Sequence, residues 1–247
     1  MGKLKARIQP EYDYDGMSFE SHVLIHETLQ LRQEELPYDS RIHSWQYIHV
    51  KRWIDIIGSL VLIALSVIPG LLIAALIALT SKGSIFYRET RIGRGGRPFR
   101  IWKFRSMCHE AEWREVIKTG SCDGGFLHWR VHKSTPDPRV TPIGGFLRRW
   151  SLDELPQLIN VLRGEMSLIG PRPVVAAEIP LYGHLQYFYL AVTPGLSGKW
   201  QVSGRSNVSF AGRADLDAGY VRDWSLRSDL VIIVRTIPAV LGRVGAR

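Results

Sequence analysis

A chain of 247 residues has room for one domain, or for one domain with a membrane anchor, and it needs no second catalytic domain. Its formal charge of +9 at pH 7 favours a polyanionic partner, which could be nucleic acid, anionic lipid or a phosphorylated small molecule. Two cysteines, Cys108 and Cys122, are too few for a disulfide framework, and the polar residues 1–50 do not have the pattern of a secretory signal. Both features predict a reducing, cytoplasmic compartment.

An apolar segment runs from Trp53 to Leu79 and is interrupted only by Asp55 and a few Gly, Ser and Pro residues. It is longer than the roughly 20 residues that a helix needs to span a bilayer. A buried core helix is the alternative, but ordinary helices are shorter and keep a polar face. The segment therefore predicts contact with a membrane.

Basic residues flank this segment on both sides. Lys51 and Arg52 precede it, and a longer basic series follows: Lys82, Arg88, Arg91, Arg94, Arg97 and Arg100. Because basic flanks mark the cytoplasmic side of a membrane segment, both ends are expected in the cytoplasm. The same basic series is expected to face anionic lipid headgroups.

The middle of the segment contains residues that weaken a helix. Ser66 can bond to its own backbone, and Pro69 removes a helical hydrogen bond. The sequence thus predicts that residues 51–81 form a re-entrant helical hairpin, anchored by its basic flank and by the Ser66 and Pro69 break, with residues 1–50 as an N-terminal cytosolic extension. A single kinked span is the alternative, because spanning helices tolerate proline.

Residues 84–105 alternate apolar and basic positions around the glycines of Gly93-Arg94-Gly95-Gly96, which predicts a β-hairpin with a glycine turn. The glycines could also cradle phosphate, but no helix is evident after them, so a plain turn is favoured. Residues 108–135 are expected to form a helix and a variable loop. Cysteines and histidines are scattered there without the spacing of a zinc site: Cys108, His109, Cys122, His128 and His132.

The stretch at residues 147–173, LRRWSLDELPQLINVLRGEMSLIGPRP, combines an acid pair with several arginines. Asp153 and Glu154 could supply a nucleophile or a metal ligand. The arginines Arg148, Arg149, Arg163 and Arg172 could bind phosphate. This mixture suits phosphoryl chemistry better than core packing.

A structural interpretation of the same acids is a capping box. Ser151 would be the N-cap and Glu154 would reach back to it, so that both acids merely start the helix LPQLINVLRG. A helix N-terminus also favours anionic groups and phosphate. The capping and catalytic interpretations can therefore hold for the same residues.

Two further segments carry candidate phosphate contacts. Arg172 lies between two prolines, a rigid setting that suits a fork-shaped anion contact. The glycine-rich residues 193–206 offer Lys199 and Arg205 near Trp200, and a nucleotide diphosphate could use all of these. The apolar run LVIIVRTIPAVLGRV near the C-terminus could lie on a membrane surface or pack in the core.

Several long motifs, in order, resemble the bacterial sugar transferases that act as monotopic polyprenyl-phosphate sugar-1-phosphate transferases. The resemblance covers about residues 51–240 and is to the short form with one membrane segment. Its marks are KRWID, SIFYRETRIGRGGRPFRIWKFRSM, DPRVTPIGGFLRRWSLDELPQLINVLRGEMSLIGPRP, TPGLSGKWQVSGRS and DLDAGYVRDWSLRSDLVIIVRTIPAV. Many members place Ser directly before Pro at the membrane break, whereas Val67 and Ile68 separate them here.

The resemblance implies that a sugar-1-phosphate passes from a UDP-sugar to undecaprenyl phosphate with release of UMP, as the first membrane step of exopolysaccharide or other surface-glycan synthesis. Asp153 would be the nucleophile that forms a covalent phosphosugar intermediate, and Glu154 would hold Mg²⁺. Adjacent anions repel unless a cation neutralises them, which agrees with a metal at this pair. The expected phosphate contacts are Arg148, Arg172, Arg205 and Lys199.

The implied architecture is a mainly α fold with a small β-hairpin, in a monotopic protein of the bacterial inner membrane. Residues 82–247 would form the catalytic domain on the cytoplasmic face. The expected partners are the UDP-sugar, undecaprenyl phosphate and membrane lipids, but not nucleic acid. Glucose, galactose and acetamido sugars all stay open as the transferred sugar, and so does homo-oligomerisation.

Three other functions compete with this one. A non-catalytic, membrane-anchored scaffold of a polysaccharide-assembly complex predicts that Asp153 and Glu154 are dispensable. A nucleic-acid-binding module would explain the charge but not the apolar segment. A glycosyltransferase that moves the sugar without its phosphate would release nucleoside diphosphate.

Overall fold

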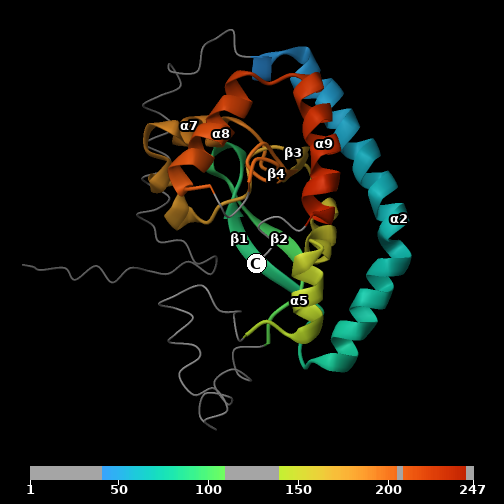
Figure 1. The fold of residues 1–247 in the computed structure, drawn as a ribbon. Coiled ribbons are helices and arrows are strands. Elements are labelled where there is room, and N and C mark those ends of the chain that lie inside the picture. Colours follow the sequence, from blue (N-terminus) through green and yellow to red (C-terminus); the bar gives the residue numbers. More distant parts are fainter. Residues whose placement is uncertain (1–40, 109–138, 205–207, 243–247) are drawn as a thin grey trace, which may run out of the picture.

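The computed structural model describes residues 41–108, 139–204 and 208–242 (Figure 1). The expected helix and loop after residue 108, and the cysteine and histidine positions beyond Cys108, lie outside these ranges, as does most of the N-terminal extension. The fold is mainly helical with two small sheets and one long apolar helix, which confirms the predicted fold class at that level.

The longer elements, in chain order, are α2 (Lys51–Thr80), β1 (Phe86–Ile92), β2 (Pro98–Phe104), α5 (Pro142–Arg149), α6 (Leu158–Arg163), β3 (Ser167–Ile169), α7 (Gln186–Ala191), β4 (Gly195–Ser197), α8 (Phe210–Arg222) and α9 (Leu226–Leu241). Short helical turns join them: η1 (Arg41–His43), η2 (Gln46–Val50), η3 (Arg94–Gly96), η4 (Leu152–Gln157), η5 (Ala176–Glu178) and η6 (Pro180–Leu185).

Helix α2 is a single bowed helix along one side of the molecule (Figure 1). It continues through Pro69, and Ser66 Oγ donates a hydrogen bond to the carbonyl of Ile63 at 3.1 Å. The structure therefore does not show the predicted break into two helices. Proline removes one backbone donor, and the apolar side chains around it offer the backbone no competing partner that would open the helix further.

The first turns of α2 are fastened to the rest of the described chain, which we call the globular body (residues 41–50, 81–108, 139–204 and 208–242). The Lys51 ammonium forms a buried ion pair with Asp229 of α9 at 2.7 Å. Arg52 donates to the last carbonyls of α6, those of Val161 and Leu162, at 2.6 Å each. These two basic residues, predicted as part of the membrane anchor, thus bind protein groups.

The far end of α2 is fastened to the same body. Ile73 and Ile77 are buried against Phe104 of β2 and Leu147 of α5. Just past the helix, Arg105 donates to the carbonyl of Ser81 at 2.9 Å. Both ends of α2 therefore contact one globular body, while most of its other apolar side chains stay exposed.

Strands β1 and β2 form the predicted antiparallel hairpin, paired from Phe86 opposite Phe104 to Ile92 opposite Pro98. Gly95 (φ 68°) and Gly96 (φ 73°) make the turn in the left-handed region that favours glycine. Successive side chains point to opposite faces of a strand, so Trp102 and its neighbour Lys103 lie on different faces of the hairpin.

The second sheet pairs β3 with β4 in parallel, and the sequence did not predict it. The loops that follow these strands pack backbone against backbone. A Cβ on Gly198 would lie 2.1 Å from the carbonyl oxygen of Gly170, a distance that no side chain permits. Because Gly170 and Gly198 have no side chains, residues 193–204 can pack directly against the segment that carries Arg172.

The core of the body lies between α7, α8 and α9, where Trp224, Tyr220 and Phe188 are buried. Helix α9 turns Ile232 and Asp229 inward. Its opposite face exposes apolar side chains at helical spacing: Leu230, Val234, Ile237 and Leu241. The sequence left open whether the C-terminal apolar run lies at the surface or in the core. In the structure one face of α9 packs in the core and the opposite face is exposed.

Candidate active site

The acid pair lies on the turn η4, between α5 and α6. Thr141 starts α5 by accepting a hydrogen bond from the backbone of Gly144 at 3.0 Å, and Pro142 occupies the first helical position. Ser151, with φ 55° and ψ 22°, then reverses the chain ahead of the acids. The non-glycine left-handed conformation is rare and marks a locally constrained turn.

The predicted capping box is absent from this part of the described chain: Ser151 has no side-chain capping bond. The Glu154 carboxylate points to the hairpin and accepts from Lys103 Nζ at 3.0 Å. Arg172 Nη1 also contacts it, at 3.4 Å. The capping interpretation of Glu154 was therefore wrong, because two cations attract its carboxylate more strongly than a backbone amide would.

Asp153 is buried, with 8% of its surface exposed. Burial raises the pKa of its carboxyl group, and the neighbouring Glu154 charge raises it further. The nearby charges of Lys103, Arg148 and Arg172 act in the opposite direction and lower this pKa. The site thus combines an acid pair with three cations that favour its ionised form.

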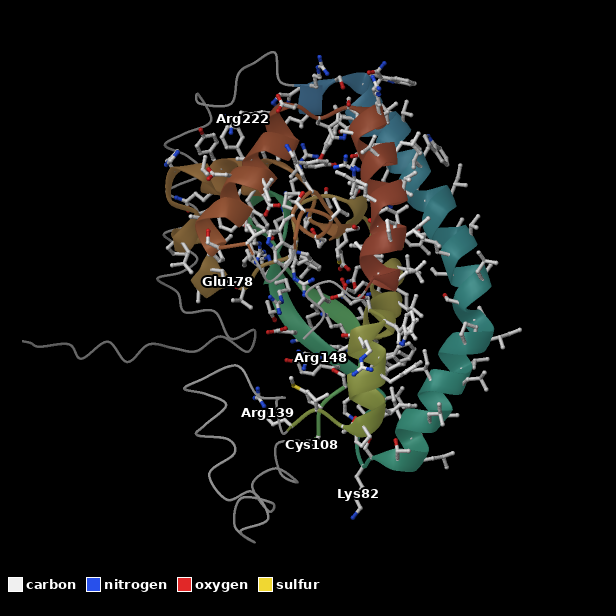
Figure 2. All side chains as sticks on the ribbon, viewed as in Figure 1. Lys82, Cys108, Arg139, Arg148, Glu178 and Arg222 are labelled. Carbon is white, nitrogen blue, oxygen red and sulfur yellow. The ribbon has the colours of Figure 1, made fainter. Side chains whose placement is uncertain are left out.

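These cations come from three separate parts of the fold. Lys103 lies on β2, Arg148 on α5 beside the hairpin (Figure 2), and Arg172 in the loop after β3. Sequence reasoning identified the last two but missed Lys103. The available signal was the alternation of RIWKFR, which places Lys103 on the opposite face of the strand from Trp102.

A shallow pocket opens beside Glu154. The hairpin, η4 and the loops around β3 and β4 line it with Arg91, Ile101, Lys103, Glu154, Gln157, Arg172, Pro173, Gly195 and Leu196. Asn160 fastens α6 to strand β2 of the hairpin: its Oδ1 accepts from the backbone of Trp102 at 3.1 Å, and its Nδ2 donates to the carbonyl of Arg100 at 2.8 Å. A phosphorylated group in this pocket would meet several guanidinium and ammonium donors.

A residue of α8, Arg213, supports the backbone at Arg172. Arg213 Nη2 donates to the Arg172 carbonyl oxygen at 3.1 Å, and its guanidinium lies 5.0 Å from the Trp200 ring centroid. Arg213 Nε is 3.8 Å from Asp217, which accepts a hydrogen bond from Tyr182 at 2.9 Å. This buried group of side chains was also missed from the sequence, because it joins residues far apart in the chain.

The remaining predicted site residues that the structure describes contact other groups. The Lys199 ammonium is beside Gly219 of α8, 3.3 Å from where a Cβ would stand. Arg205 lies outside the described residues. Lys51, Arg52, Ser66 and Pro69 belong to α2 and have the contacts given above. The structure thus brings together Asp153, Glu154, Arg148 and Arg172 from the predicted set.

A buried carboxylate among cations, on a body fastened along an exposed apolar helix, suits an enzyme that acts on phosphorylated substrates at a membrane. Comparison with known sequences defines the class further. The family described as bacterial sugar transferase matches residues 45–243, and the chain belongs to this family. Its membership confirms the resemblance seen in the motifs.

The chain is 48% identical over 194 residues to the exopolysaccharide production protein ExoY of Sinorhizobium fredii, covering 77% of this chain and 84% of that protein. It is 42% identical over 230 residues to the UDP-galactose-lipid carrier transferase of Erwinia amylovora, and 40% identical over 201 residues to the undecaprenyl-phosphate galactose phosphotransferase of Salmonella typhimurium. These matches cover 92% and 80% of this chain, but only 46% and 41% of the two longer proteins.

Proposed function

We propose that the protein transfers a sugar-1-phosphate from a UDP-sugar to undecaprenyl phosphate and releases UMP. The enzyme class, polyprenyl-phosphate sugar-1-phosphate transferase, is that of its relatives, and the membrane attachment agrees with α2. The observation that carries the proposal is the contact of Lys103 and Arg172 with Glu154, beside the buried Asp153. The name of the ExoY relative supports a role in exopolysaccharide synthesis, and we propose that the reaction is the first membrane step of exopolysaccharide or other surface-glycan synthesis.

The proposed chemistry has two displacements at one phosphorus. An oxygen of the Asp153 carboxylate attacks the phosphorus that bears the sugar, and the bond to the UMP oxygen breaks, so that UMP leaves with the electron pair. A phosphate oxygen of undecaprenyl phosphate then attacks the same phosphorus, and the carboxylate of Asp153 leaves unchanged. The adjacent cations stabilise the charge that gathers on the phosphoryl oxygens in both steps.

The local residues support this role for Asp153. A nucleophilic carboxylate must be ionised; burial and the Glu154 charge raise the pKa of Asp153, and the charges of Lys103, Arg148 and Arg172 limit this rise. Burial also removes water that would compete for the acyl-phosphate intermediate. Arg148 and Arg172, which the sequence predicted, are the proposed phosphate contacts. Lys103, which the sequence did not predict, is a third. Phosphate binding by Lys199 and Arg205 stays a prediction.

The acid pair also fits Mg²⁺. This ion is commonly bound by one or two carboxylates together with substrate phosphates and water. Asp153 and Glu154 are such a pair, and the Glu154 charge is one of the causes that raise the pKa of Asp153. A cation between the two carboxylates would relieve this repulsion. We propose that Glu154 holds the ion, which when bound would neutralise charge on the diphosphate.

For the membrane, we propose that α2 enters and leaves on the same side, because both of its ends are fastened to one globular body. Lys82, just past the helix, points away from the body (Figure 2), where it can meet lipid headgroups. The nucleotide sugar is soluble and cytoplasmic, so the catalytic domain would lie on the cytoplasmic face of the inner membrane. Residues 51–81 would then be a re-entrant segment and residues 1–50 cytosolic.

The decisive experiment measures nucleotide release by purified protein in detergent with Mg²⁺, undecaprenyl phosphate and a panel of UDP-sugars. We expect UMP from the wild type and from the surface control Asp223→Asn, and none from Asp153→Asn or Glu154→Gln. UDP in place of UMP would show direct glycosyl transfer and remove Asp153 as the nucleophile. No nucleotide from folded protein with any donor would favour a non-catalytic scaffold.

A further inference from the structure

Two arginines share one tryptophan on the face of the hairpin opposite Lys103. Arg88 pairs with Trp102 across the strands, and its guanidinium carbon lies 3.8 Å from the Trp102 ring centroid. The guanidinium carbon of Arg163, from the end of α6, lies 5.9 Å from the same ring. Both arginines are exposed, whereas Trp102 is half-buried.

Neither arginine is neutralised within the chain as described. Among residues 41–108, 139–204 and 208–242, no carboxylate forms an ion pair with Arg88 or Arg163. The indole face attracts each cation, but the two cations repel each other. An anion bound between them would relieve this repulsion, and guanidinium groups match the geometry of phosphate.

Both sides of this cluster adjoin α2. On one side, Phe86 lies edge-on to Trp102 and stacks on Phe104, which packs against Ile73 and Ile77 of α2. On the other side, Gly164 follows Arg163 in the chain, and a Cβ on it would lie 3.5 Å from Arg52 Nη2 near the start of α2. The cluster therefore lies where the body adjoins the two ends of the apolar helix.

We propose that Arg88, Trp102 and Arg163 bind the phosphate of an anionic membrane phospholipid and hold the hairpin at the level of the headgroups. Tryptophan is enriched at this level, and Phe86 beside it is 39% exposed. Lys103, which contacts Glu154, lies on the opposite hairpin face, so a substrate phosphate at Glu154 would not use this cluster. The proposal rests on the membrane attachment of α2 and not on the transfer reaction.

The test uses full-length protein in neutral detergent micelles that contain increasing fractions of phosphatidylglycerol. Its melting temperature is recorded by circular dichroism, because a ligand that binds the folded state stabilises it. We expect the lipid to raise the melting temperature of the wild type. For the double variant Arg88→Gln/Arg163→Gln, half of the rise should need on the order of 25-fold more lipid, at about tenfold per 1.4 kcal/mol and about 1 kcal/mol per arginine.

Arg222→Gln is the control, since it removes an exposed arginine that also stacks on an aromatic ring, Phe188. This control should respond to phosphatidylglycerol as the wild type does. Arg88→Lys/Arg163→Lys keeps both charges and should show an intermediate response, because it loses the fork-shaped donors.

Three outcomes would overturn the proposal: an unchanged lipid response in the double glutamine variant, an equal stabilisation of the wild type by inorganic phosphate or phosphatidylcholine, or an equal loss in the control. UMP release by the double glutamine variant, measured in detergent micelles that contain phosphatidylcholine, separates a failure of this proposal from a failure of the proposed function. If Arg88→Gln/Arg163→Gln raised the KM for undecaprenyl phosphate but left the response to phosphatidylglycerol unchanged, the cluster would bind the acceptor substrate. That result would overturn the proposal.

Discussion

Arg213 of α8 donates a hydrogen bond to the backbone carbonyl of Arg172 at 3.1 Å and so holds the loop that brings Arg172 to Glu154. Arg213 itself is 8% exposed. It lies against the rings of Trp200 and Phe210. Helix α8 thus positions Arg172, a proposed phosphate contact, without contributing a group to the pocket.

The first prediction concerns this positioning role. Replacing Arg213 by Gln should lower kcat for UMP release by about tenfold, because a phosphate contact that moves by an ångström loses much of its effect. Arg213→Lys should recover part of the loss, and Arg222→Gln on the exposed side of α8 should have little effect. Wild-type kcat in a folded Arg213→Gln protein would show that Arg172 is held without it.

The second prediction concerns pH and stability. Burial raises the pKa of Asp217 from 3.8 to about 6, against the opposing effects of Tyr182 and Arg213. The folded state therefore binds the proton more tightly than the unfolded state, so stability from this group is present below pH 4 and is lost as the pH rises to 6. The loss should be about 2 to 3 kcal/mol.

Asp217→Asn should remove this part of the pH dependence, since the amide does not titrate. Urea denaturation in detergent at pH 4, 5, 6 and 7 measures it, with the exposed Asp223→Asn as control. A parallel pH profile for Asp217→Asn and wild type would contradict the assignment.

The third prediction compares two lysines. Lys103→Gln should lower kcat by about 10² to 10³, the usual effect of losing one charge-stabilising donor at a reaction centre. Lys199→Gln should have a much smaller effect, because its ammonium lies beside Gly219 of α8. Steady-state UMP release at saturating donor measures both, and equal losses would place Lys199 at the reaction centre as well.

The fourth prediction concerns the buried ion pair between Lys51 and Asp229. Lys51→Met should destabilise the protein by about 3 to 5 kcal/mol, because it leaves a buried carboxylate without its cation. Lys51→Met/Asp229→Asn should be more stable than the single variant, since the amide leaves no buried charge and its oxygen can still accept from Tyr220. Thermal melts in detergent compare them, and a single variant as stable as wild type would show that the pair contributes little.

The fifth prediction tests the side on which α2 ends. In a protein with Cys108 and Cys122 replaced by Ser, one cysteine is placed at Ser44 and another, in a second variant, at Ser84. Both should resist a membrane-impermeant maleimide in intact cells and react after lysis. Labelling of only one of them in intact cells would indicate a helix that crosses the membrane.

The sequence predicted the parts of this fold that depend on local patterns. The turn at Gly95 and Gly96 follows from glycine between alternating strands, and the acid pair with Arg148 and Arg172 follows from one short stretch. Lys103 and Arg213 reach the site only through tertiary packing, which no local pattern reports. Serine is a common N-cap residue, which is why the sequence predicts a capping box at Ser151. Its left-handed backbone depends instead on how α5 and η4 meet, and its side chain makes no capping bond.

The continuity of α2 through Pro69 has a similar origin. A proline removes one hydrogen bond, but whether a helix breaks there depends on what the rest of the helix contacts. Ile73 and Ile77 are held against Phe104 and Leu147, which keeps the second half of the helix in line. The sequence shows the weak point and not the packing that compensates for it.

A spanning helix must match the thickness of the bilayer, and its tilt changes when the lipid chains lengthen or shorten. Helix α2 is fastened at both ends to one body through Lys51 and Arg105, so its length is matched to the protein and not to the distance between two membrane surfaces. In the proposed re-entrant arrangement, the depth of the catalytic site would be set from one leaflet alone. Such an enzyme can keep the same working geometry in thin and in thick membranes.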